Sequence, residues 1–128
     1  MNAFIKILLI FVSGGLGYGI LEIIWRRKTH WSMILAGGVC LTILYEIYSK
    51  HSSMSLVNRG LVGAAIITLV ELVFGLIFNC GLKMEVWDYS KMRYNYKGQI
   101  CLGYSVLWGI LSVPVSFFCI YLNSFFVK

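Results

Sequence analysis

The sequence has 128 residues, of which 59% are hydrophobic and only 12% are charged. Soluble domains carry about a quarter charged residues, so this composition excludes an ordinary soluble domain. The formal net charge of +6 is also found in nucleic-acid binders, but the basic residues lie in short breaks between apolar stretches. Such breaks are where membrane proteins carry topology signals, and we expect no nucleic-acid partner.

Four apolar stretches of membrane-spanning length follow one another along the chain. A helix needs about 20 mostly apolar residues to cross the hydrocarbon core, and the absence of period-two alternation excludes barrel strands. We therefore predict an all-α membrane protein, a single transmembrane domain over residues 1–128 that forms a bundle of about four helices. The predicted spans are residues 3–25, 31–48, 61–82 and 100–127, with a short amphipathic connector at 84–99 before the last helix.

The first two spans each carry a carboxylate within about a turn of their end. Glu22 shares a helical face with Tyr18, and Glu46 shares one with Thr42. Ionisable groups at membrane depth are costly, so both are candidate residues of a ligand-binding or ion-binding site. The alternative is that they only hold neighbouring helices together.

Glu71 lies nearly at the centre of the third predicted span and is the strongest site candidate. A carboxylate there costs at least ~2.5 kcal/mol on insertion scales and calls for a partner, water or a role. Asn79 shares its helical face and is a second candidate. Small and polar residues recur along this face at spacings of three and four: Gly60, Ala64, Thr68, Glu71, Gly75 and Asn79.

The fourth span carries a similar small and polar face, which includes Ser105, Gly109, Ser112 and Ser116. Pro114 lies inside this span and removes one backbone donor, so we expect a kink there. If the polar faces of the spans converge, they enclose an acidic interior that suits a cation, a cationic group or a proton relay.

The connector holds a compact polar and aromatic motif. Asp88 and Ser90 suit a helix N-cap or a turn, Asn95 and Gly98 suit a turn, and the aromatic rings suit the headgroup level of a membrane. We expect these residues to form a motif or to contact a partner. The motif residues are Trp87, Asp88, Tyr89, Ser90, Asn95 and Gly98.

Three parts of the sequence carry a resemblance to a known family. They are W-D-Y-S at residues 87–90, the run from Gly98 to Gly109, and Glu71-Leu72 with Gly75. These elements resemble the CmpB-like ABC-transporter permease family of small multispanning bacterial membrane proteins. The resemblance implies a permease component, and because this sequence has no G-x-x-x-x-G-K-[ST] loop, any ATP hydrolysis would belong to a separate subunit.

The positions of the basic residues predict the orientation in the cell membrane. The breaks after the first and third spans hold seven Lys and Arg residues, and the other side holds four. The positive-inside rule therefore predicts a cytoplasmic connector and both termini outside.

Three functions remain open from the sequence. The first is a small transporter or permease-like component, which would need an oligomer or a partner subunit because four helices enclose a narrow lumen. The second is a non-transporting scaffold or regulatory subunit, and the third is an intramembrane enzyme acting on a lipid or isoprenoid. The sequence has no nucleophile or nucleotide motif and its four cysteines lack C-x-x-C spacing, so we expect no catalytic residue, metal or cofactor.

Overall fold

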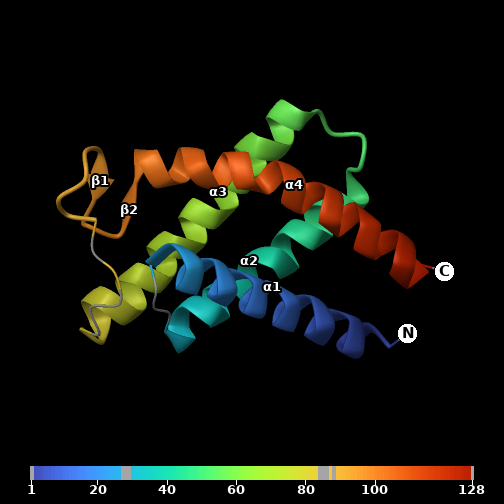
Figure 1. The fold of residues 1–128 in the computed structure, drawn as a ribbon, viewed down its shortest axis with the longest axis horizontal. Coiled ribbons are helices and arrows are strands. Elements are labelled where there is room, and N and C mark those ends of the chain that lie inside the picture. The colour runs from blue at the N-terminus through green and yellow to red at the C-terminus, as the bar shows by residue number, and fades with distance from the viewer. Residues whose placement is uncertain (1, 27–29, 84–86, 88, 128) are drawn as a thin grey trace. The chain divides into compact units, whose positions relative to one another are not determined.

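The computed structural model describes residues 2–26, 30–83, 87 and 89–127, and these form four long helices and one small hairpin. The helices are α1 (Ala3–Arg26), α2 (Trp31–Lys50), α3 (Leu56–Phe74) and α4 (Leu102–Val127), and a π-helix, η1 (Gly75–Gly81), directly continues α3 (Figure 1). The hairpin pairs β1 (Asn95–Tyr96) with β2 (Ile100–Cys101). The predicted all-α membrane fold is confirmed.

All four helical segments are long and apolar enough to cross a membrane: Ala3–Ile24, Trp31–Lys50, Leu56–Gly81 and Leu102–Phe126. The third begins five residues before the predicted start, because Ser55 caps α3 by accepting a hydrogen bond from the Asn58 backbone N–H at 3.2 Å. His30 caps α2 in the same way through the backbone N–H of Ser32.

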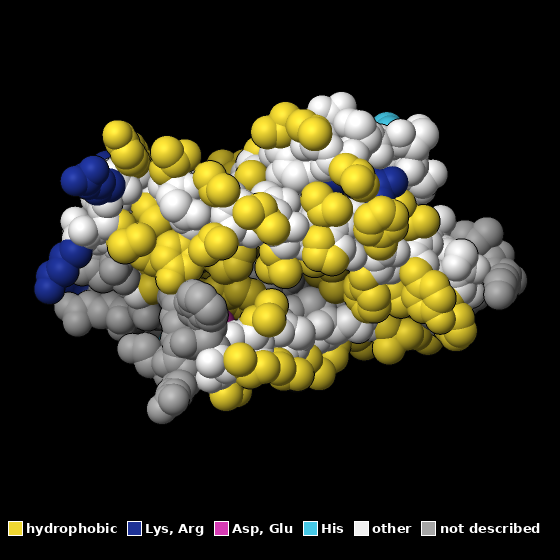
Figure 2. Space-filling model, turned by 45° about the horizontal axis from the view of Figure 1, so that its top comes forward, with side chains coloured by type: hydrophobic (Ala, Val, Ile, Leu, Met, Phe, Trp, Pro, Cys, Tyr) yellow, Lys and Arg dark blue, Asp and Glu magenta, His cyan; other side chains and the backbone are white. Residues whose placement is uncertain are grey.

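The surface of these helices is apolar where a soluble protein would be polar. In α1, Phe4 and Ile24 are 71% and 72% exposed, and most other large apolar residues of this helix are also exposed. Hydrophobic side chains cover much of the face seen in Figure 2. Lipid is the solvent that matches such a surface, so the chain is a multi-pass membrane protein.

The chain divides into two compact units. The first consists of Met1–Met54 and Val115–Lys128, and the second of Ser55–Pro114. Helix α4 contributes to both units and continues through Pro114, the residue at the boundary.

Helices α1 and α2 of the first unit pack at very short range through glycines. A Cβ built on Gly14 would lie 2.5 Å from the Cβ of Leu41 and 2.7 Å from the carbonyl oxygen of Gly37. A Cβ on Gly37 would in turn lie 2.6 Å from the Cβ of Tyr18. Small residues let helix backbones approach closely in lipid, where dispersion contacts replace the hydrophobic effect as the driving force.

This packing predicts that alanine substitutions at two glycines of α1 have different effects on the free energy of unfolding. Gly14→Ala should lower the free energy of unfolding by about 1–3 kcal/mol, because the new methyl group meets the backbone of α2. Gly17→Ala is the matched control, since no described atom beyond its chain neighbours and its own helix backbone lies within 4 Å of a Cβ at Gly17. Thermal unfolding in detergent measures both, and equal melting temperatures for the two variants would contradict the packing.

Candidate functional site

Glu71 of α3 is buried, with 6% of its surface exposed, and its carboxylate joins three segments of the second unit. The Tyr89 hydroxyl, from the connector, donates a hydrogen bond to Oε2 at 3.0 Å. The indole Nε1 of Trp108, from α4, donates to Oε1 at 2.9 Å. Each carboxylate oxygen therefore accepts from a different part of the chain.

The chemistry of these donors suits a carboxylate. An indole N–H can only donate, and a phenol hydroxyl readily donates, so both match an acceptor with two oxygens. Hydrogen bonds to an ionised acceptor are stronger than neutral ones, which offsets part of the cost of burying Glu71.

An aromatic stack holds the two donors in place. Tyr89 stacks on Tyr104 of α4, with ring centroids 4.9 Å apart and ring planes 17° apart. Tyr104 in turn lies against Trp108, one turn later on the same helix, with centroids 5.9 Å apart. The stack fixes both rings, so little freedom is lost when they bond to Glu71.

A second set of hydrogen bonds, centred on Asn79 and Gln99, ties the connector to η1. The Asn79 amide nitrogen donates to the Gln99 side-chain oxygen at 2.8 Å and to the Trp87 carbonyl oxygen at 3.1 Å. The Trp87 indole donates to the Gln99 carbonyl oxygen at 2.9 Å. Gly75 leaves room for this contact, since a Cβ there would lie 2.5 Å from the Gln99 side-chain oxygen.

The tip of the connector is a tight turn shaped by Asn95 and Gly98. The φ angles of Lys97 and Gly98 are 52° and 73°, and two positive φ values at the central positions are typical of a type I′ turn. The Asn95 side chain accepts from the Gly98 backbone N–H at 3.0 Å and donates to the Met92 carbonyl at 2.8 Å. The expected turn at Asn95 and Gly98 is therefore present, as part of a hairpin.

The small and polar face predicted for residues 60–79 is the face on which α4 and the connector pack. Gly60 lies against Gly109, Thr68 shares a hydrogen bond of 2.7 Å with Ser105, and Glu71 binds Trp108. We call Glu71, Asn79 and the residues that bond to them or stack on their partners the Glu71 cluster. Its other members are Trp87, Tyr89, Gln99, Tyr104 and Trp108.

The other candidate acids lie in the first unit. Glu22 is buried and accepts a hydrogen bond of 2.7 Å from Tyr18, the residue predicted on its face. Glu46 is half-exposed and forms an ion pair of 3.0 Å with Lys50, one turn later on α2. An exposed pair of this kind satisfies the charge of Glu46 without a ligand.

The six motif residues have different environments. Trp87, Tyr89 and Gly98 are buried, Ser90 and Asn95 are exposed, and Asp88 lies outside the described residues. Because Asn95 also bonds within its own turn, the motif mainly shapes the connector and attaches it to α3.

Three members of the Glu71 cluster were not among the sequence candidates, namely Gln99, Tyr104 and Trp108. Trp108 is the seventh residue of α4, deeper than the headgroup level where tryptophan is usual, and an indole N–H at that depth needs an acceptor. The position of Trp108 in the sequence therefore indicated a hydrogen-bond acceptor inside the membrane, such as Glu71.

Among the described residues, no group of three or more His, Cys, Asp or Glu side chains is arranged to hold a metal ion. The four cysteines, all among the described residues, form no disulfide: Cys101 and Cys119 are buried, Cys40 is half-buried and Cys80 is exposed.

Four membrane-spanning helices, with a buried polar cluster that joins α3, the connector and α4, define the class: a multi-pass helical membrane protein. The chain belongs to the family described as "Putative ABC-transporter type IV", which matches residues 8–128. No curated protein and no solved structure matches the chain.

The contacts of the Glu71 cluster predict that the stability of the protein depends more on the shape of the Glu71 side chain than on its charge. In Glu71→Gln the amide oxygen still accepts from Trp108, and the amide N–H₂ donates to Tyr89, so the melting temperature should stay close to that of the wild type. Glu71→Leu leaves both donors without this acceptor and should lower the unfolding free energy by about 2–5 kcal/mol.

The matched control is Glu46→Leu, which removes an exposed carboxylate and should change the melting temperature little. Thermal unfolding in lipid nanodiscs measures all three variants. A Glu71→Gln variant as unstable as Glu71→Leu would mean that the negative charge itself is required, as an ion site would demand.

Proposed function

We propose that this chain is the membrane-spanning component of a transporter and that ATP hydrolysis resides in a separate subunit. The observation that carries the proposal is the family match, which extends over residues 8–128 and so includes the last three spans and most of the first. The sequence contains no phosphate-binding G-x-x-x-x-G-K-[ST] loop, so a transporter of this type needs a partner that supplies one.

In this proposal the polar route past α3 is lined by Glu71 and Asn79 of the second unit, and Glu22 is a separate candidate acid of the first unit. A cation or proton that passes Glu71 has to compete with the hydroxyl of Tyr89 and the indole of Trp108. Movement of the connector, which carries Tyr89, is the simplest way to free one carboxylate oxygen. In this proposal the position of the connector therefore controls whether Glu71 is free to bind a cation or proton that passes α3.

The same contacts favour a second candidate function, a non-transporting scaffold or regulatory subunit. Glu71 is already bonded to two donors in a buried site, so a structural role is sufficient to account for it. In a scaffold, Glu71→Gln should support full function, whereas a transported cation or proton depends on the carboxylate.

The proposed transporter role predicts a specific partner. Tagged full-length chain is crosslinked in the membranes of cells that produce it and then purified, and crosslinked polypeptides are identified by mass spectrometry. We expect a subunit with a G-x-x-x-x-G-K-[ST] loop, and ATP hydrolysis that is lost when the lysine of that loop is replaced. Cells with the untagged chain are the control.

Recovery of crosslinked copies of this chain or other membrane proteins, always without a nucleotide-hydrolysing subunit, would contradict the transporter proposal and support the scaffold. Crosslinked copies together with the ATPase would indicate a homo-oligomeric permease.

We also propose that residues 84–99 face the cytoplasm and that both termini lie outside, because seven basic residues lie on the connector side and four on the other. Alkaline phosphatase fused after Lys128 should be active, and green fluorescent protein at the same position should be dark. The opposite pattern would place the connector outside.

A further inference from the structure

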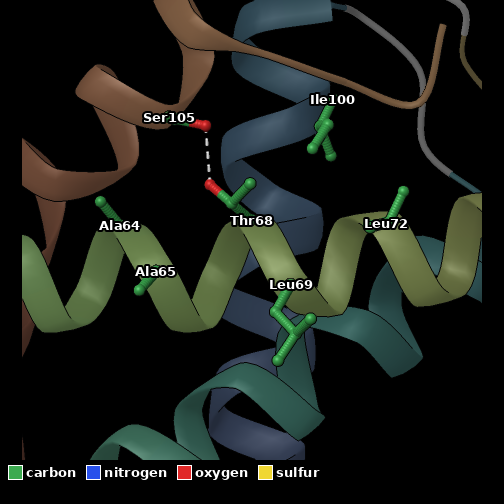
Figure 3. Close-up of a pocket in the computed structure, with 7 residues that line it drawn as sticks. All are labelled: Ala64, Ala65, Thr68, Leu69, Leu72, Ile100 and Ser105. Atoms are coloured by element: carbon green, nitrogen blue, oxygen red, sulfur yellow. Dashed lines mark hydrogen bonds between the residues drawn. The ribbon is translucent and has the colours of Figure 1, made fainter. Parts of the chain in front are cut away.

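An open groove of about 400 Å³ runs between α3, β2 and the start of α4 in the second unit. Its floor on α3 is made by Ala64, Ala65, Leu69 and Leu72. Ile100 of β2 closes one side, and Thr68 and Ser105 lie where α3 meets α4 (Figure 3).

The lining of the groove favours an apolar occupant. Its two hydroxyl groups, on Thr68 and Ser105, point toward each other from α3 and α4 and share a hydrogen bond of 2.7 Å (Figure 3). The other lining side chains are hydrocarbon, so a hydrocarbon chain leaves that bond intact and covers the alanine and leucine side chains, whereas a polar group would find few partners there. Since α3 and α4 are membrane-spanning helices, the hydrocarbon available along the groove is a lipid acyl chain.

A cationic surface is formed by residues that precede Ile100, a lining residue of the groove, in the sequence. Lys91, Arg93 and Lys97 are all exposed, and we call them the basic tip. No acidic residue occurs among residues 89–101, so nothing in that stretch neutralises the three charges.

Two contacts hold the basic tip at the end of the groove that lies nearest the lipid headgroups. Ile100, which lines the groove, is the strand partner of Tyr96, and Tyr96 directly precedes Lys97. The backbone N–H of Leu102, the first residue of α4, donates to the Tyr94 carbonyl at 3.3 Å. The tip is therefore held where the fourth span begins, which is the level of lipid headgroups.

The exposed aromatic residues of the hairpin suit that level. Tyr94 and Tyr96 are 78% and 52% exposed, and the Lys97 ammonium lies 5.6 Å from the centroid of the Tyr96 ring. Tyrosine and lysine side chains of this kind are typical of the membrane interface, where basic residues attract anionic phosphate groups.

We propose that the groove and the basic tip together bind one anionic phospholipid, with an acyl chain along α3 and the phosphate group at Lys91, Arg93 and Lys97. The site is independent of whether the chain transports anything. It accounts for an exposed cationic turn beside an apolar groove, two features that the Glu71 cluster does not use.

The test uses purified full-length chain in mild detergent, titrated with phosphatidylglycerol or phosphatidylcholine, with bound lipids counted by native mass spectrometry. We expect phosphatidylglycerol to be retained at about tenfold lower concentration than phosphatidylcholine, with the preference falling as salt rises. The triple variant Lys91→Gln, Arg93→Gln, Lys97→Gln should lose the preference. Ala65→Leu, which fills the groove without touching the Thr68–Ser105 bond, should weaken retention of both lipids.

The matched control removes three charges elsewhere, by Lys6→Gln, Lys50→Gln and Lys128→Gln, and should keep the wild-type preference. Equal melting temperatures verify that the variants are folded. The proposal is overturned if the wild type retains the two lipids equally, or if the triple variant at the tip keeps the preference. Loss of a crosslinked acidic protein from the tip variant, with lipid retention unchanged, would also overturn it and assign the tip to a protein partner.

Discussion

A carboxylate placed in the third membrane-spanning segment must be satisfied by the rest of the chain, and much of the second unit is arranged to do so. The two donors that bind Glu71 come from the connector and from α4, so one side chain fixes both segments against α3. The stacked rings of Tyr89, Tyr104 and Trp108 then orient these donors. A buried acceptor of this kind favours one packing, because an alternative packing of α4 would leave Glu71 without its indole partner.

The two units are held together internally by different means. In the first, glycines let α1 and α2 approach so closely that a single added methyl group would overlap the facing backbone. In the second, polar side chains on α3 and η1 bond to the connector and to α4. Both means are suited to lipid, where apolar side chains gain little by leaving one hydrocarbon environment for another.

The sequence predicted most of the fold because long apolar runs leave few alternatives to helices in a membrane. It also identified Glu71 and the face from Gly60 to Asn79, since a helical period of 3.6 places these residues together regardless of what they contact. The ion pair of Glu46 with Lys50 was not predicted, although their spacing of four residues is typical of such pairs on exposed helix faces.

The partners of that face were not predictable in the same way. Trp108 and Tyr89 are separated from Glu71 by 37 and 18 residues, so their contacts depend on how the connector folds back. That fold depends on positive φ angles at Tyr94, Lys97 and Gly98, and only the last of these is a glycine. The π-helix η1 likewise has no distinct sequence period, because its residues also fit an α-helix.

The order in which the chain is made gives the Glu71 cluster a further consequence. When α3 leaves the ribosome and reaches the membrane insertion machinery, neither Tyr89 nor Trp108 has been synthesised. Until they arrive, Glu71 has to remain in contact with water or be protonated, since an unpaired carboxylate is disfavoured in hydrocarbon. Helices α3 and α4 are therefore expected to enter the bilayer as a pair, with the connector between them folding before α3 is released into lipid.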